Sequence, residues 1–323
     1  MCLVALAIDQ SRRFPLVVAA NRDEFFKRET ARLGWWSAQP GEPPILGGRD
    51  LDSGGTWMGL TAQGRLALLT NVRSPRAAEY GAPSRGRVVT DWLAGGEETG
   101  DFWMRTALSG YNGFNLIAAD FLRGECFWGS NTGAHPRRLD RGIYGLSNGG
   151  LDAPWPKVTA LKAQMQASMS ASMTADELAA RLFESLADRT IAADDALPQT
   201  GVPLELERQL SPAFIRTADN AYGTRSSTLI ITEKIGRAPV THVYERSFAP
   251  SGEAELMRRA VLKNWPPRYL ADDVNAPVEP GLVSEHGGHE VEDGDARLPR
   301  TRVRSLLKPP PDRRRRRSAV VIA

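Results

Sequence analysis

Apolar runs of strand length alternate with short polar turns in the N-terminal part of the chain. Residues 3–8 and 15–20 form one pair of such runs, and residues 57–61 and 65–71 form another. Runs of this length that are bounded by turn signals are typical of buried strands, and the short turns between them predict hairpins. The chain is therefore predicted to begin with two antiparallel hairpins, and the second strand of each hairpin ends in polar residues.

Helical patterns fall between blocks of strands rather than after every strand. Helices are predicted at residues 87–93, 101–108, 156–168 and 174–187, and the last of them opens with a capping box, Thr174-Ala175-Asp176-Glu177. Further strands are predicted at residues 115–119, 125–128, 142–147, 228–232 and 239–246, and a short closing helix at residues 253–261. Strands joined by short turns, with helices between the blocks, predict an α+β fold with mostly antiparallel sheets rather than a doubly wound parallel sheet.

Two stretches of the N-terminal part follow neither period. Residues 25–45 contain three prolines and are predicted to be irregular. Residues 47–56 hold four glycines and two aspartates, a composition typical of a tight loop with unusual backbone angles. The glycine spacing fits neither the P-loop nor the dinucleotide pattern, so a phosphate-binding role for this loop is disfavoured.

The composition of the chain changes near residue 271. Residues 271–323 contain few apolar residues and many prolines, glycines and charges, with five consecutive arginines at 313–317. Such a segment cannot bury enough apolar surface to fold. Residues 1–270 are therefore predicted to form one domain, and residues 271–323 a disordered charged tail.

The overall composition excludes several functional classes. The chain is 41% hydrophobic and 24% charged with a net charge of +3, which gives no electrostatic reason to expect a nucleic-acid partner. Two cysteines cannot form a disulfide framework, so a reducing compartment is expected. No apolar run reaches transmembrane length, and the N-terminal run lacks the basic flank of a signal peptide. A cytoplasmic location is therefore expected.

Cys2 is the first candidate for chemistry, because it directly follows the initiator methionine. Removal of Met1, which is usual before a small residue, would place a thiol and a free α-amine on one residue. The α-amine titrates at about 7.7–8.0 and can act as the base for its own side chain, so neither a histidine nor a metal is needed. The alternative is that Cys2 is a small core residue, which is the commoner role of a cysteine in an apolar run.

Polar side chains at the ends of strands provide partners for this cysteine. Arg22, at the end of the second strand, would lower the thiol pKa or bind a substrate carbonyl or carboxylate, and Asp23 would hold the α-amine. Asn71 and Asn148 also end strands, and their amides are suited to an oxyanion hole. Arg225, before a late strand, adds a further cationic group.

These residues stand in a pattern that resembles the NRDE family, also called the transport and Golgi organisation family. The resemblance covers roughly residues 1–270 and rests on Asn21-Arg22-Asp23-Glu24, on Met1-Cys2, on residues 47–59 and 69–71, and on Tyr222-Gly223-Thr224-Arg225-Ser226-Ser227. It implies an N-terminal-nucleophile fold, a four-layer αββα sandwich. It also implies links to haem trafficking, to lipid homeostasis and acyl-CoA metabolism, and to organisation of the secretory pathway.

A more distant similarity is to the choloylglycine hydrolase and acid ceramidase group. The matching positions, in the same order along the chain, are Cys2, Arg22, Asp23, Asn71, Asn148 and Arg225. In those hydrolases the arginine and the aspartate share one strand face, whereas the adjacent Arg22 and Asp23 would face opposite sides of a regular strand. Either the strand bulges, or one of them lies outside the site and Asn21 pairs with Asp23 instead.

Two functions are predicted on this basis, and the alternative to both is a scaffold with no small-molecule site. The first is hydrolysis of amide or thioester bonds in a small acyl substrate, with Cys2 as the nucleophile and no cofactor required. The second is a non-catalytic carrier of haem or of an acyl-CoA-like lipid that uses the same pocket. In the carrier, Cys2 would ligate the haem iron as a thiolate, and Arg22, Arg73 and Arg225 would meet propionates or phosphates.

Overall fold

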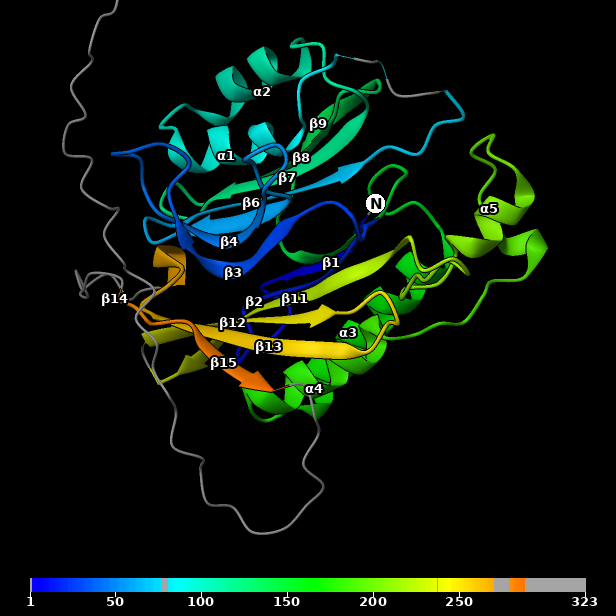
Figure 1. Cartoon of the computed structure of the whole chain (residues 1–323). Helices are drawn as coiled ribbons and strands as arrows, with labels where there is room; N and C mark the ends of the chain where they lie inside the picture. Colours follow the sequence, from blue (N-terminus) through cyan, green and yellow to red (C-terminus); the bar gives the residue numbers. More distant parts are fainter. Residues whose placement is uncertain (1, 77–78, 80, 237, 270–278, 288–323) are drawn as a thin grey trace, which may run out of the picture.

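Two antiparallel sheets lie face to face, and helices cover the outer face of each sheet (Figure 1). The computed structural model describes residues 2–76, 79, 81–236, 238–269 and 279–287. Helices α1 (Gly86–Ala94) and α2 (Thr99–Ala107) lie over one sheet. Helices α3 (Pro156–Ala171) and α4 (Ala175–Leu186) lie under the other, so the layers follow the order αββα. The predicted four-layer α+β sandwich with antiparallel sheets is confirmed.

The first sheet has the strand order β10-β1-β2-β11-β12-β13-β14, with β15 also paired to β13. Its strands are β1 (Cys2–Ile8), β2 (Leu16–Phe25), β10 (Gly142–Leu146), β11 (Tyr222–Ile235), β12 (Ala238–Phe248), β13 (Ala254–Lys263), β14 (Glu279–Pro280) and β15 (Ser284–Gly287). The second sheet runs in sequence order from β3 to β9. Its strands are β3 (Thr30–Trp36), β4 (Ile45–Asp50), β5 (Met58–Thr61), β6 (Arg65–Asn71), β7 (Phe114–Asp120), β8 (Glu125–Ser130) and β9 (Ala134–Arg138).

Four of the helices fall where the sequence pattern placed them, between blocks of strands, whereas no helix was predicted over residues 204–209. The helices are α1 (Gly86–Ala94), α2 (Thr99–Ala107), α3 (Pro156–Ala171), α4 (Ala175–Leu186) and the short α5 (Leu204–Gln209), with 3-10 turns η1 (Asp194–Ala196) and η2 (Pro267–Tyr269). The capping box of α4 is formed, because the side chain of Thr174 accepts a hydrogen bond from the backbone N–H of Glu177.

Strand β1 is buried on both faces, which explains its uninterrupted apolar sequence. Val4 and Leu6 point between the two sheets and belong to the central core. Leu3 and Ala5 point toward α3 and α4 and belong to a second core on the outer face of the same sheet. A strand that is covered on both faces has no solvent side and needs no alternating polar residues. Burial of β1 in this way fixes the position of its first residue, Cys2.

Two predictions about secondary structure are wrong. Residues 253–261, predicted as a helix, lie mostly in strand β13, which pairs with β12 from Phe248↔Ala254 to Val240↔Lys263. Only Ala260 and Leu262 of this strand are fully buried. The alternation of buried and exposed residues therefore covers too few positions to be recognised in the sequence. Residues 25–45, predicted to be irregular, contain strand β3 and begin strand β4.

The glycines of residues 47–56 serve close packing more than tight turning. Gly47 and Gly48 lie within β4, and the turn follows at residues 51–54, where Gly54 adopts a φ of 76°. A Cβ atom on Gly47 would lie 2.5 Å from the carbonyl oxygen of Met58, and one on Gly48 would overlap the ring of Trp57. The missing side chains therefore let β4 approach β5 and let the ring of Trp57 pack against β4.

The first sheet continues past residue 270. Strands β14 and β15 both pair with β13, so part of the segment predicted to be a tail forms the edge of this sheet. Residues 271–278 and 288–323, which hold the rest of the predicted tail, lie outside the described residues. Among the residues that the structure describes, none of the helices has the length and apolar character of a transmembrane segment.

Candidate active site

A cavity of about 310 Å³ opens where β1 begins and β2 ends. Both sheets contribute to it, and so does the segment that leads into α1. We call it the Cys2 cavity; its polar and aromatic lining includes Cys2, Arg22, Asp23, Glu24, Arg28, Asp50, Ser53, Trp57, Asn71 and Arg85. Four of the six predicted site residues therefore line a single cavity. Cys2, Arg22 and Asp23 come from the first sheet, and Asn71 comes from the second.

Cys2 and Arg22 lie directly opposite each other in the β1–β2 ladder. Side chains of directly paired residues project from the same face of a sheet. That face is the inner one, because Val4 and Ala20, two residues further along each strand, both belong to the central core. The sheet thus presents a thiol and a guanidinium side by side at the edge of its apolar core.

The thiol of Cys2 is almost completely buried, and this raises its pKa above the ordinary value. The negative charge of Asp23 acts in the same direction, whereas Arg22 and a hydrogen bond from the Asp23 backbone lower the pKa. Burial has the largest effect, so the thiol is protonated at neutral pH. A nucleophilic role for Cys2 therefore requires a base close to the sulfur.

Arg22 is held by packing more than by ion pairing. Its guanidinium lies 4.3 Å from the ring centroid of Trp57, while its ion pairs with Glu24 and Asp50 are long, at 3.8 and 3.9 Å. The side chain is only 5% exposed, and its buried Nη1 has no hydrogen-bond partner among the described residues. A buried donor without a partner is costly, so Nη1 is a ready contact for a ligand oxygen in the cavity.

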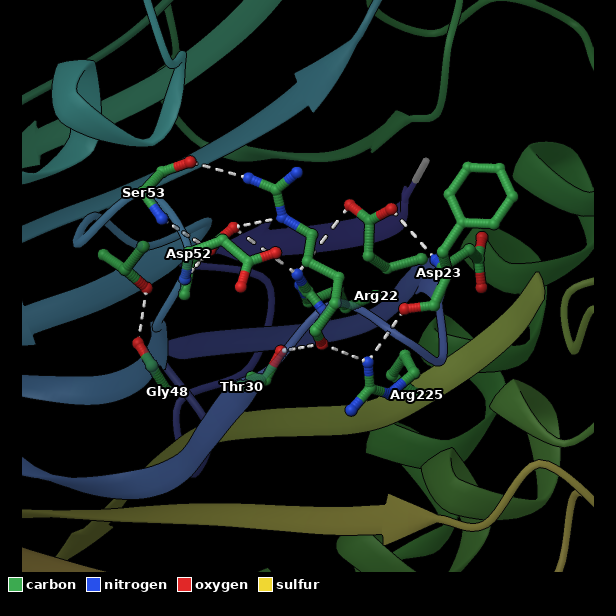
Figure 2. A network of polar contacts seen from close by, with 12 residues as sticks. Arg22, Asp23, Thr30, Gly48, Asp52, Ser53 and Arg225 are labelled. Carbon is green, nitrogen blue, oxygen red and sulfur yellow. Dashed lines mark hydrogen bonds and ion pairs between the residues drawn. The ribbon is translucent and has the colours of Figure 1, made fainter. Parts of the chain in front are cut away.

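Asp50 organises the wall of the cavity that faces Arg22, next to Asp52 and Ser53, which Figure 2 labels. Its Oδ2 accepts a hydrogen bond from Nε of Arg28 at 2.6 Å, and its Oδ1 accepts from the backbone N–H groups of Asp52 and Ser53 at 3.0 and 3.1 Å. Nη2 of Arg28 donates in turn to Oγ of Ser53 at 2.7 Å. One carboxylate therefore joins the turn after β4 to the turn after β2.

Asp23 points away from Arg22, toward the helical layer. Its Oδ1 accepts a hydrogen bond from Oγ1 of Thr224 at 2.7 Å, and burial raises the pKa of its carboxyl. Asn21, on the same strand face, donates to the backbone carbonyls of Leu186 and Ala213 and does not line the cavity. The alternation expected of a regular strand thus holds, and Asp23 reaches the cavity because it lies beyond the first residue of β1.

Lys157 lies in the first turn of α3, close enough to Asp23 to lower the pKa of its carboxyl. Its Nζ donates to the backbone carbonyls of Leu210 and Pro212 at 2.7 and 3.3 Å. Burial lowers the pKa of Lys157 to about 8, although Asp23 acts in the opposite direction. This lysine had no distinguishing signal in the sequence.

Asn71 and Asn148 lie together, but they meet the cavity differently. Asn71 lines it, and its side-chain amide forms no hydrogen bond with any described residue. Nδ2 of Asn148 donates to the backbone carbonyl of Asn71 at 2.7 Å, and Asn148 itself does not line the cavity. The hydroxyl of Ser147 donates to the carbonyl of Cys2 at 3.0 Å. The end of β10 therefore positions both Cys2 and Asn71.

Arg225 lies outside the Cys2 cavity. It is the unpaired residue where the register of β11 against β2 shifts, between Thr224 and Ser226. Its Nη1 donates to the backbone carbonyls of Phe25 and Arg28 at 3.0 and 2.7 Å, and its side chain lines a neighbouring hollow. Its hydrogen bonds join β11 to the turn that carries Arg28.

Arg73 also lies outside the Cys2 cavity. Its guanidinium lies 4.8 Å from the ring centroid of Trp155 and pairs with Glu207 of α5. On the side of the second sheet, the cavity is lined by Arg85 instead. Arg85 donates to the carbonyl of Gly113 at 3.1 Å and forms no ion pair with the described residues. Arg85 lies in the loop before α1. This loop contains several arginines, so the sequence pattern did not distinguish Arg85 as a site residue.

The part of the chain that builds this cavity matches a known family. A family model described as Transport and Golgi organisation 2 matches residues 1–250. The chain belongs to the Transport and Golgi organisation 2 family. All the residues that line the Cys2 cavity lie within the part that this family model matches.

Curated relatives cover most of the chain. It is 31% identical to the Transport and Golgi organization protein 2 homolog of Bos taurus over 274 residues, which cover 78% of this chain and 94% of the relative. The homolog of Homo sapiens is also 31% identical, over 77% of this chain and 93% of the relative. The Transport and Golgi organization protein 2 of Drosophila melanogaster is 23% identical, over 78% and 95%.

Two solved structures show a weaker likeness to this member of the Transport and Golgi organisation 2 family. A C2A mutant of conjugated bile acid hydrolase from Clostridium perfringens has a TM-score of 0.40 and 10% identity, over 73% of this chain and 90% of that chain. A Caenorhabditis elegans ortholog of N-acylethanolamine-hydrolyzing acid amidase has a TM-score of 0.40 and 11% identity, over 71% and 92%. Likeness of this degree assigns no activity to the chain.

Proposed function

We propose that this protein hydrolyses an amide or thioester bond of a small acyl substrate, with Cys2 as the N-terminal nucleophile. The observation that carries the proposal is the direct pairing of Cys2 with Arg22 inside a cavity that Asn71 closes from the other sheet. A nucleophile, a cation with an unpartnered donor, and a free amide then face one space. Groups of these three kinds are what acyl transfer uses.

The first chemical step is acyl transfer to sulfur. After removal of Met1, the α-amine of Cys2 accepts the thiol proton, and the sulfur forms a bond to the acyl carbon. The tetrahedral intermediate then collapses, the bond to the leaving nitrogen or sulfur breaks, and the leaving group takes the proton from the α-ammonium. An S-acyl enzyme and a free amine or thiol result, and no cofactor takes part.

The second step returns the enzyme to its starting state. A water molecule gives one proton to the α-amine, and its oxygen adds to the thioester carbon. The bond between this carbon and the sulfur of Cys2 then breaks, and the sulfur takes the proton back from the α-ammonium. A carboxylic acid leaves the cavity. The same α-amine therefore serves both steps as base and then as acid.

The two partners of Cys2 have separate tasks in this mechanism. The side-chain amide of Asn71, which has no partner among the described residues, donates to the developing oxyanion. Arg22, through its buried Nη1, binds a substrate oxygen and stabilises the thiolate. Asn148 acts through Asn71, because its amide holds the carbonyl of that residue.

Covalent labelling tests this proposal. The purified protein is incubated with a short-chain acyl p-nitrophenyl ester, and its mass is measured before and after reaction. We expect one acyl group on Cys2, no adduct in Cys2→Ala, and unchanged labelling in Cys126→Ala, because burial raises the pKa of Cys126 to about 12. Equal labelling of the Cys2→Ala variant and the parent would remove Cys2 from the mechanism.

A second candidate function is a carrier that binds haem or an acyl-CoA-like lipid in the same cavity without turnover. It is favoured by Arg85, which adds a second positive charge to that of Arg22. Arg85 forms no ion pair with the described residues. Cys2 would then ligate haem iron as a thiolate. A haem titration followed by the Soret band separates the two functions. A Soret shift that is lost in Cys2→Ala and kept in Cys126→Ala, together with no acyl labelling, would support the carrier.

A further inference from the structure

A second hollow of about 470 Å³ lies next to the Cys2 cavity and shares one residue, Trp57, with it. Strand β3 of one sheet and strands β11 to β13 of the other enclose it. The residues that matter for its chemistry are Trp57, Arg225, Ser226, Glu245, Ser247 and Phe248. We call it the Arg225 hollow. The hydrolytic mechanism uses none of its residues except Trp57.

One row of paired residues connects the two spaces. Cys2 pairs with Arg22, Arg22 with Ser226, and Ser226 with Ser247, across four neighbouring strands. Directly paired side chains share a sheet face, so all four project between the sheets. Neighbouring strands lie about 4.8 Å apart, which places Ser226 roughly 10 Å from Cys2 along the row. A polar row therefore runs from the thiol into the second hollow.

The Arg225 hollow contains donors that lack partners. Ser226 is only 6% exposed, and its Oγ has no hydrogen-bond partner among the described residues. Arg225 uses a single nitrogen, Nη1, for its two hydrogen bonds to carbonyls, and it forms no ion pair within the described ranges. Figure 2 shows Arg225 on the side of the polar network opposite Ser53. Its remaining N–H groups and the buried hydroxyl are free to meet an acceptor.

The other two arginines of the hollow already pair with carboxylates. Arg32 pairs with Glu255 at 2.8 Å, and Arg258 pairs with Glu285. Arg225 is therefore the one lining arginine whose charge no described carboxylate balances. An unbalanced guanidinium next to an unpartnered hydroxyl suits an oxyanion, because a planar guanidinium binds a carboxylate through two parallel hydrogen bonds.

The rest of the lining favours a carboxylate over a phosphate. Glu245 is buried in the hollow, and its Oε1 accepts a hydrogen bond from the backbone N–H of Leu33 at 2.6 Å. Burial raises the pKa of Glu245, and when ionised this group would repel a dianion more strongly than a monoanion. Trp57 and Phe248 add aromatic surface, which suits a ligand with an apolar body next to its charged group.

We propose that the Arg225 hollow binds the carboxylate of a small aromatic or aliphatic organic acid. Arg225 makes the ion pair, Ser226 donates its hydroxyl, and Trp57 and Phe248 contact the apolar body of the acid. The site does not depend on hydrolysis, because Cys2 contributes nothing to it. A ligand here would lie against the face of Trp57 that also supports Arg22, so occupancy of the hollow and the geometry of Arg22 are linked.

Isothermal titration calorimetry of the full chain with benzoate tests the proposal. We expect binding by the parent and an affinity loss of about tenfold or more in Arg225→Gln, because a charge-assisted pair is lost. Glutamine keeps a donor for the carbonyls of Phe25 and Arg28, so the variant is designed to fold, which its melting curve checks. Ser226→Ala is expected to weaken binding severalfold without touching these carbonyls. Arg105→Gln, on the exposed surface of α2, is the control that should bind like the parent.

Two further titrations decide where the anion binds. Cys2→Ala should bind benzoate like the parent, so failure of the hydrolytic mechanism and failure of this site remain distinguishable. Inorganic phosphate should bind at least tenfold more weakly than benzoate. The proposal is overturned by absence of benzoate binding to the parent, by parent-like binding in folded Arg225→Gln, by loss of binding in Cys2→Ala, or by a preference for phosphate.

Discussion

Cys2 and Arg22 lie opposite each other on neighbouring strands, and both side chains face the space between the sheets. Their neighbours along the same face, Val4 and Ala20, are buried in the central core. The thiol and the guanidinium thus occupy the first polar row after the apolar core ends. Trp57, which reaches Arg22 from the other sheet, holds the guanidinium over this row.

Replacement of Arg22 by lysine should slow acyl labelling of Cys2. A lysine keeps the charge but loses the stacking on Trp57 and the buried Nη1, so we expect a rate reduction of roughly tenfold, or about 1.4 kcal/mol. Arg65→Lys is the matched control, because Arg65 lies 4.4 Å from the ring centroid of Trp92, away from the site. Equal loss of labelling in both variants would mean that stability, rather than contact with the reacting groups, explains the effect.

Asp50→Asn should loosen the cavity wall while the protein stays folded. An asparagine keeps an acceptor for the turn after β4 but loses the charge that pairs with Arg28, so we expect labelling of Cys2 to fall about three- to tenfold. Asp120→Asn is the control, since Asp120 accepts from two turn N–H groups and pairs with Arg65 in the same way. Stopped-flow release of p-nitrophenol measures the rate, and a parent-like rate in Asp50→Asn contradicts the assigned role.

Gly48→Ala should destabilise the fold and displace Trp57. The new methyl group would overlap the indole ring, and overpacking of this kind costs about 1–3 kcal/mol in the free energy of unfolding. Gly96→Ala is the control, because a Cβ atom there meets no heavy atom within 4 Å. Urea unfolding of both variants measures the difference, and equal stability of the two would show that β4 does not need a glycine at this position.

Lys157 should make stability depend on pH in the alkaline range. Its folded-state pKa, about 8, lies below the ordinary value of 10.5, so the unfolded chain binds more protons between these two pH values. The contribution of Lys157 to the free energy of unfolding therefore rises as pH increases from about 8 to 10.5, by up to about 3 kcal/mol. Urea unfolding at both pH values, for the parent and for Lys157→Met, checks this. If the free energies of unfolding of the parent and of Lys157→Met differ by the same amount at both pH values, Lys157 is not a buried titrating group.

The sequence pattern predicted the layers of the fold well, because strands that are buried on both faces leave continuous apolar runs such as residues 3–8. It failed at β13, where only Ala260 and Leu262 are buried and the edge of the sheet leaves little periodicity. It also failed at Gly47 and Gly48, because a glycine needed for close packing has the same letter as a glycine needed for a turn.

The site was accessible to sequence reasoning only in part. Cys2, Arg22 and Asn71 are marked by the ends of apolar runs, and the structure brings them to one cavity. Asp50 and Lys157 carry no such mark, because their importance comes from contacts made across two sheets or between a helix and a strand. Position along the chain identifies a strand end, whereas long-range pairing decides which strand ends meet.

The chemical state of residue 2 tests the central proposal most directly. The protein is purified without an N-terminal tag, digested, and its N-terminal peptide is analysed by mass spectrometry before and after reaction with the acyl ester. We predict a peptide that begins at Cys2 with a free α-amine, and an acyl group on this residue after reaction. Retention of Met1 in all of the protein would contradict the mechanism, because the α-amine of Cys2 would then be part of a peptide bond.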